Sequence, residues 1–222
     1  MVNSISGVVQ TLINSDLSLQ DALQRRYGNY SAIARVLKPK VEEALARKVK
    51  LEAIITSVKR TTASYRFQPK DLMKVIANSV INLRTDVAKI SVEKTSETLR
   101  SIREALASYS EEFFQVLEGI SAITLVFDQK LFDDVKSIFG KEKVLDEKRN
   151  LAAIVVHSSR DIINLPGCAI AFYNPVSRNH INIEETMSCF TDTIIILKME
   201  DVGRAFAVLT DLKNEARKNM EK

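Results

Sequence analysis

A repeated pattern in the C-terminal part of the 222-residue chain most constrains its fold. Residues 86–92 (DVAKISV) and residues 150–156 (NLAAIVV) both read as strands, and they lie 64 positions apart. A buried strand followed by a helix is expected at residues 121–139, and the same pattern returns at residues 192–210, an offset of 71. Such self-similarity predicts two units of the same fold in one chain.

Each unit is predicted to run strand, helix, strand, strand, helix. In the first unit, Leu99, Ile102 and Leu106 fall on one helical face after the first strand. In the second unit, residues 181–190 and 193–199 are expected to pair as antiparallel strands. Two helices that cover one face of an antiparallel sheet give an α+β fold of the ferredoxin-like (βαββαβ) kind.

The N-terminal part is predicted to be all-helical. Apolar residues recur at helical spacing in five short segments, at about residues 5–13, 18–27, 29–38, 39–47 and 51–60. Because Lys38 precedes Pro39, the chain is expected to bend there. The segment YSAIAR, followed by a turn and a second short helix, favours a helix-turn-helix-like domain. The expected domains are residues 1–67 (helical), 68–79 (connector helix), 80–148 (first unit) and 149–222 (second unit).

Charge is unevenly distributed. Residues 1–70 hold twelve Lys and Arg against five Asp and Glu, a net charge of +7, whereas the remaining residues carry a net charge of −3. A basic helical domain favours contacts with duplex DNA, and the alternatives are a solvated basic face or a protein-docking bundle. The candidate DNA-binding residues are Arg35, Lys38, Lys40, Lys50, Thr56, Ser57, Lys59 and Arg60.

Several classes of protein are not expected from this sequence. No apolar run approaches the roughly 18–20 residues that span a bilayer, and no basic segment precedes an apolar one at the N-terminus. Cys168 and Cys189 form no CxxC pair, which favours a reduced, cytoplasmic protein. No catalytic triad, phosphate-binding loop or metal-ligand spacing is present, so we expect no enzyme activity, no cofactor and no metal.

The second unit resembles the ACT domain, a small-molecule-sensing module of regulated amino-acid enzymes and of some transcription regulators. The resemblance depends on the segments NLPG at 164–167, HINI at 180–183, TIIIL at 193–197 and EDVGRAFAVL at 200–209. The first unit is similar only in pattern, because its loop SVEKTSET lacks the Pro-Gly pair. A helical head followed by ACT-like units resembles the layout of archaeal-type regulators.

The resemblance implies that a small ligand, often an amino acid, binds where the first loop of the unit meets strands of a neighbouring domain. The residues that match are Asn164, Leu165, Pro166, Gly167, Asn179, His180, Asn182 and Ile183. Glycine lets backbone approach a ligand closely, a helix N-terminus suits a carboxylate, and asparagine amides both donate and accept. The alternative is structural: asparagine near a turn often bonds its own backbone.

The sequence therefore predicts a ligand-responsive transcription regulator. Its helical head would bind DNA, and its ACT-like units would bind an amino acid and form a homodimer, as the resemblance implies. A ligand that prefers one dimer geometry would shift the population toward it. The alternative is a regulatory or scaffold subunit of a metabolic enzyme that does not bind DNA, with ACT-like units for dimerisation.

Overall fold

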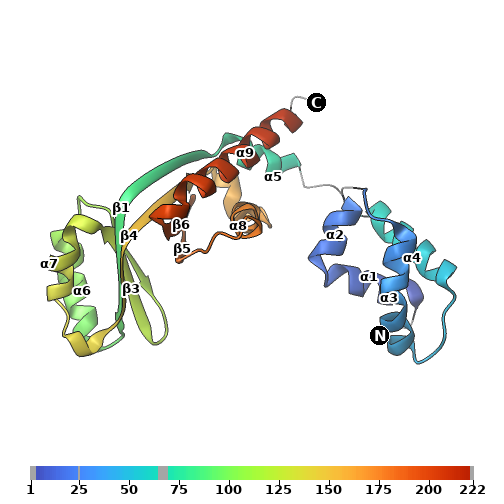
Figure 1. Cartoon of the computed structure of the whole chain (residues 1–222), viewed down its shortest axis with the longest axis horizontal. Helices are drawn as coiled ribbons and strands as arrows, with labels where there is room; N and C mark the ends of the chain where they lie inside the picture. The colour runs from blue at the N-terminus through green and yellow to red at the C-terminus, as the bar shows by residue number, and fades with distance from the viewer. Residues whose placement is uncertain (1–3, 25, 65–69, 221–222) are drawn as a thin grey trace. The chain divides into compact units, whose positions relative to one another are not determined.

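The computed structural model describes residues 4–24, 26–64 and 70–220. The chain divides into two compact units, Met1–Pro69 and Lys70–Lys222, which we call unit 1 and unit 2 (Figure 1). The boundary expected between residues 67 and 68 lies outside the described residues.

Unit 1 is helical in its described residues. It contains α1 (Ile5–Asn14), α2 (Leu17–Gln24), α3 (Tyr30–Leu45) and α4 (Leu51–Ser64). The side chain of Asn29 caps α3 by accepting from the amides of Ser31 and Ala32, and Ala46 ends the helix in the left-handed conformation. The apolar stripes of α1, α3 and α4 form one core, which includes Val9, Ile13, Leu37, Val41, Ile54 and Val58.

The bend expected at Lys38–Pro39 is wrong, since α3 continues through Pro39 to Leu45. Proline cannot donate to the carbonyl of Arg35, but Pro39 is exposed, so water can satisfy that carbonyl. The segment YSAIAR is therefore not followed by a turn. The pair of helices joined by a short connection is instead α3 and α4, with residues 46–50 between them.

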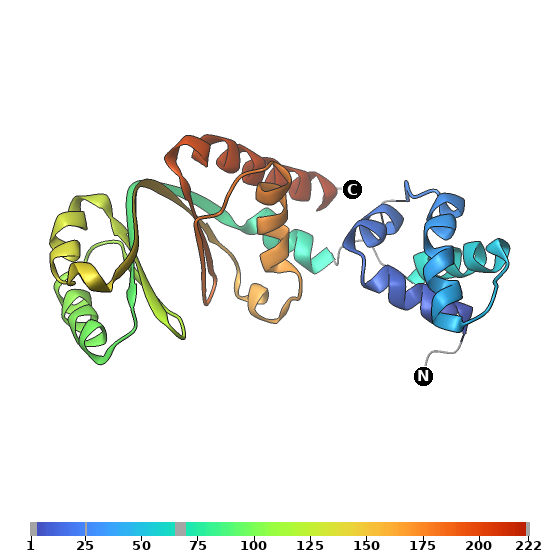
Figure 2. The same cartoon turned by 60° about the horizontal axis from the view of Figure 1, so that its bottom comes forward.

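Unit 2 contains one six-stranded antiparallel sheet with the strand order β2-β3-β1-β4-β6-β5 (Figures 1 and 2). The strands are β1 (Val80–Glu93), β2 (Phe114–Glu118), β3 (Ala122–Asp128), β4 (Val144–His157), β5 (Glu185–Cys189) and β6 (Asp192–Lys198). The helices are α5 (Lys70–Asn78), α6 (Ser96–Ser108), α7 (Phe132–Ser137), α8 (Cys168–Arg178) and α9 (Val202–Met220). Four short 3-10 helices precede longer elements: η1 (Gln129–Leu131), η2 (Lys141–Lys143), η3 (Arg160–Asn164) and η4 (Met199–Asp201).

The two central strands, β1 and β4, are each shared by two lobes. The C-terminal half of β1 pairs with β3 and the C-terminal half of β4 pairs with β6, while each N-terminal half pairs with the C-terminal half of the other strand. Asp86 and Asn150 have φ values of 55° and 56°, and the β1–β4 register shifts beside them, so each strand carries a bulge at its middle.

The first lobe holds β2, β3 and the adjoining halves of β1 and β4, with α6 and α7 on one face (Figures 1 and 2). The second lobe holds β5, β6 and the other halves, with α5, α8 and α9. Each lobe contains four strands in the ferredoxin-like order. The last strand of the second lobe is the N-terminal half of β1, which comes before all its other strands in the sequence.

The internal repeat predicted from the sequence is present in this topology. Residues 86–92 and 150–156 occupy matching halves of β1 and β4. Val87 of β1 pairs with Asp128 of β3, and the corresponding residue of β4, Leu151, pairs with Lys198 of β6. Matching positions of β3 and β6 are therefore 70 residues apart, where the sequence had suggested 71. The boundary expected at 148–149 falls inside β4, because one strand serves both lobes.

Each lobe has its own core between sheet and helices. In the first lobe, Phe114 stacks on Phe127 with ring centroids 5.6 Å apart. In the second lobe, Ile154 and Phe172 are buried with Leu72 and Val75 of α5, and Arg217 of α9 donates to the carbonyl of Ala77. A third cluster lies on the opposite face of the sheet and joins the lobes: Val87, Val126, Leu151, Ala153, Ile194 and Ile196.

We expect Ile154→Ala to lower the free energy of unfolding by about 2–5 kcal/mol, because it leaves a cavity at a fully buried position. Ile170→Ala on α8, where the side chain is about half exposed, is the matched control and should change stability far less. Denaturant unfolding followed by circular dichroism measures both. Equal losses in the two variants would contradict this placement of the core.

Candidate ligand-binding site

The loop that carries NLPG joins β4 to α8. Asn164 ends η3, Leu165 packs on the core of the second lobe, and Gly167 precedes the first residue of α8. Gly167 has a φ of 93°, a backbone conformation that residues other than glycine rarely adopt. A β-carbon there would meet only Leu72, at 3.9 Å. The glycine is therefore required by its backbone conformation and not by lack of space.

The second predicted group follows α8. The side chain of Asn179 donates to the carbonyl of Pro175 at 2.9 Å, and Arg204 donates to the carbonyl of Asn179 at 2.6 Å. Asn182 donates to Glu184 at 3.4 Å, and His180 is exposed with φ of 55°. Strand β5 begins at Glu185 rather than 181, so these asparagines lie in the connection before it. The side chain of Asn179 is therefore bonded to nearby backbone, as expected if its role is structural and not ligand binding.

The two predicted groups are separated by α8 within one chain. That helix has 11 residues and is therefore about 16 Å long. The loop at 164–167 lies at its N-terminal end and residues 179–183 lie at its C-terminal end. A single small ligand cannot span this length, so the two groups can share a ligand only across an interface between copies of the chain.

A depression of about 490 Å³ lies beside the NLPG loop. Asp71 and Lys74 line it from α5, and Arg160 and Asp161 line it from η3. Asn164 and Leu165 complete the lining, so two of the residues expected from the sequence lie in it. Asp71 and Lys74 were missed because α5 was expected to be a connector, while the structure packs it on the second lobe.

The candidate DNA-binding residues differ in their exposure. Ser57 is buried and donates to the carbonyl of Ala53 at 2.9 Å, so it is unavailable to a phosphate. Lys38 is half-buried and lies 3.9 Å from Glu42. The other candidates are exposed: Arg35, Lys40, Lys50, Thr56, Lys59 and Arg60.

A charged pair at the junction of the lobes was not found from the sequence. The guanidinium of Arg84 donates to both carboxylate oxygens of Asp128, at 2.8 and 2.9 Å, and lies 5.0 Å from the ring centre of Phe113. Burial of Asp128 opposes its ionisation, but the hydrogen bonds and charge of Arg84 outweigh burial and hold its pKa below the usual range. The two residues are 44 positions apart, and only the pairing of β1 with β3 brings them together.

Within the described parts of the chain, no three His, Cys, Asp or Glu side chains gather in a way that could hold a metal ion. Among those same residues, no helix combines the length and apolar character needed to cross a bilayer. Both cysteines are free thiols, and burial raises the pKa of Cys168.

Comparison with known proteins shows a likeness of fold. No protein-family model matches the chain, and a search of curated proteins finds no match. The regulatory subunit of aspartate kinase from Thermus thermophilus, in its ligand-free form, is 12% identical, with a TM-score of 0.51 over 60% of this chain and 95% of that one. The regulatory subunit from Thermus flavus is 11% identical, with a TM-score of 0.51 over the same shares.

The aspartate kinase of Clostridium acetobutylicum is 17% identical, with a TM-score of 0.50. The match covers 61% of this chain but only 34% of that enzyme, so the chain spans about a third of its length. Unit 1 makes up less than a third of the chain, so the matched share must draw on unit 2. These similarities show that unit 2 shares a fold with regulatory subunits of aspartate kinase, and they give no support to a helix-turn-helix head.

We expect Asp128→Asn to lower the free energy of unfolding by about 1–3 kcal/mol at pH 7, because Arg84 loses its charged partner. The folded-state pKa of Asp128 is lowered, so its contribution is complete above the ordinary value of about 3.9 and is lost as pH falls through the folded value. The difference between variant and parent should therefore shrink in acid.

Unfolding by urea between pH 7 and pH 2 measures this difference. Asp211→Asn, at an exposed position on α9, is the control for loss of a carboxylate. A difference that stays constant down to pH 2 would contradict the assignment of the effect to ionised Asp128.

Proposed function

We propose that this protein is a ligand-responsive regulator in which unit 2 binds a free amino acid. The observation that carries the proposal is the depression beside the NLPG loop, which presents cations and carboxylates together in an ACT-like fold. The similarity of fold to regulatory subunits of aspartate kinase supports a regulatory role over a catalytic one.

The lining of the depression suits a zwitterion. Lys74 and Arg160 can pair with a carboxylate, and Asp71 and Asp161 can pair with an ammonium group. Asn164 offers a donor and an acceptor, and Leu165 offers an apolar contact for a side chain. A volume of about 490 Å³ is at the lower part of the range of small-molecule sites.

A second copy of the chain completes the site in this proposal. Asn179, His180, Asn182 and Ile183 lie at the far end of α8, so they reach a ligand at the NLPG loop only from another protomer. Strand β5 is an edge of the sheet, and its free side can pair with the same strand of a partner. A homodimer in which the ligand contacts both protomers would couple ligand binding to dimer geometry.

A thermal-shift panel with the twenty amino acids at millimolar concentration tests ligand binding. At about 100 times its dissociation constant, a ligand should raise the melting temperature by about 5–10 °C. Arg160→Gln and Asp161→Asn should each abolish the shift, while Arg100→Gln, exposed on α6 of the first lobe, should retain it. A flat panel, or a shift that survives both substitutions, would overturn this site.

Asn182→Ala tests the contribution of the second protomer. It should weaken the shift produced by the same amino acid, and sedimentation should show that the ligand strengthens the dimer. An unchanged response from a monomeric protein would contradict the shared site and leave the depression by itself to explain binding.

For the output of unit 1, we propose DNA binding through its exposed basic residues. On α4, Thr56, Lys59 and Arg60 are exposed and spaced to share one helical face. If this face contacts phosphates, the logarithm of affinity should fall linearly with the logarithm of salt concentration, by about 0.9 per phosphate contact. The net charge of residues 1–70 favours such contacts.

Anisotropy of a labelled duplex measures the salt dependence. The double variant Lys59→Gln, Arg60→Gln should reduce the slope by about two, while Lys218→Gln, exposed on α9 of unit 2, should leave it unchanged. Absence of binding at low salt would favour the second candidate, a regulatory or scaffold subunit whose helical unit docks a protein.

A further inference from the structure

The internal repeat creates two related junctions between the lobes, one at the bulge of β1 and one at the bulge of β4. Adding 64 to a β1 position gives its β4 counterpart, so Arg84 corresponds to Lys148 and Asp86 corresponds to Asn150. Adding 70 to a β3 position gives its β6 counterpart, so Asp128 corresponds to Lys198.

The junction at β1 is closed by a salt bridge. Arg84 and Asp128 form two parallel hydrogen bonds across the end of β3, and Asp128 is almost fully buried. Bidentate pairs of this kind fix the geometry of the groups that they join. This pair therefore ties the end of β3 to the N-terminal half of β1.

The junction at β4 has two cations at the corresponding positions. Lys148 and Lys198 carry charges of the same sign, so the salt bridge of the other junction cannot form between these two positions. Lys148 bonds Glu184 at 2.5 Å, and Lys198 lies 3.6 Å from Glu200. Both partners in the second pair are more than half exposed, so that contact is weak and readily exchanged.

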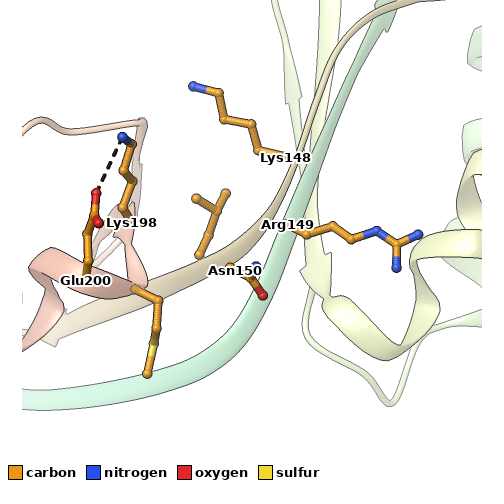
Figure 3. A pocket seen from close by; sticks show the side chains of 7 residues that line it. Lys148, Arg149, Asn150, Lys198 and Glu200 are labelled. Carbon is orange, nitrogen blue, oxygen red and sulfur yellow. Dashed lines mark ion pairs between the residues drawn. The ribbon is translucent and has the colours of Figure 1, made fainter.

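An open depression of about 440 Å³ remains at this junction. Figure 3 shows Lys148 and Lys198 on the same side of the strands, while Arg149 points the opposite way, toward α7. Arg149 pairs there with Asp133 and lies 3.8 Å from the ring centre of Phe132, so it is not available to the depression. Leu151 and Met199 add apolar lining, and Leu151 is almost fully buried.

We propose that the depression at the β4 bulge binds a small organic anion whose carboxylate lies between Lys148 and Lys198, in the place that the Asp128 carboxylate occupies at the related junction. The apolar part of the anion contacts Met199, whose side chain is exposed. Glu184 keeps Lys148 oriented toward the sheet, and Lys198 exchanges its contact with Glu200 for the ligand. The anion thereby ties β6 to the N-terminal half of β4, as Arg84 and Asp128 tie the other junction.

This site is separate from the amino-acid site proposed above. Its lining comes from β4, β6 and η4, whereas the depression at the NLPG loop is lined from α5, η3 and the loop itself. The proposal stands on the geometry of the junction alone, so either site can fail without the other.

The test is a thermal-shift series on the full chain with butyrate, succinate and citrate, against sodium chloride of equal ionic strength. At least one carboxylate at about 100 times its dissociation constant should raise the melting temperature by about 5–10 °C. Lys198→Gln and Lys198→Asp should both abolish this shift. Without ligand, Lys198→Asp should be at least as stable as Lys198→Gln, because the new carboxylate can pair with Lys148.

Lys141→Asp, at an exposed position in η2, carries the same change of charge as Lys198→Asp and should retain the shift. No response to any carboxylate, or a response that persists in both Lys198 variants, would overturn the proposal. Inorganic phosphate is the comparison anion: a Lys198-dependent shift with phosphate and none with the carboxylates would overturn the assignment to a carboxylate.

Discussion

The structure of unit 2 depends on two long strands that each belong to two lobes. Because β1 and β4 pair with one another along both halves, neither lobe has a complete sheet without the other. The bulges at Asp86 and Asn150 interrupt the register at the middle of each strand. The buried cluster around Val87 and Leu151 then joins the open faces of the lobes. Every candidate site in unit 2 is positioned by this shared pairing.

The charged groups near the bulges show how an internal repeat can diverge in chemistry while the backbone is retained. One junction carries Arg84 and Asp128, which pair with each other, and the other carries Lys148 and Lys198, which pair instead with Glu184 and Glu200. The NLPG loop shows the same separation of backbone from chemistry. Gly167 is required by its φ value, while the charged side chains nearest the loop come from α5 and η3.

Much of the fold of unit 2 was predictable from short-range patterns. The apolar strands, the helix that carries Leu99 and Ile102, and the spacing of the repeat could all be read from the sequence. The path of α3 could not be predicted from Pro39, because an exposed proline can be accommodated inside a helix when water replaces the missing donor. The residues of the candidate site were predicted only in part. Asn164 and Leu165 line the depression as expected, but its charged residues come from α5 and from the start of η3.

The sequence by itself determined where most strands and helices of unit 2 lie, since apolar periodicity and caps act over a few residues. It also determined that unit 2 contains two related lobes, because an internal repeat can be recognised in the sequence without knowing which residues are in contact. Only the tertiary structure decided that the two lobes share β1 and β4 and that α8 separates the two groups of predicted ligand residues. It also decided that Lys198 occupies, in the second lobe, the position that Asp128 has in the first. These features depend on pairing between strands far apart in the chain, which local patterns do not specify.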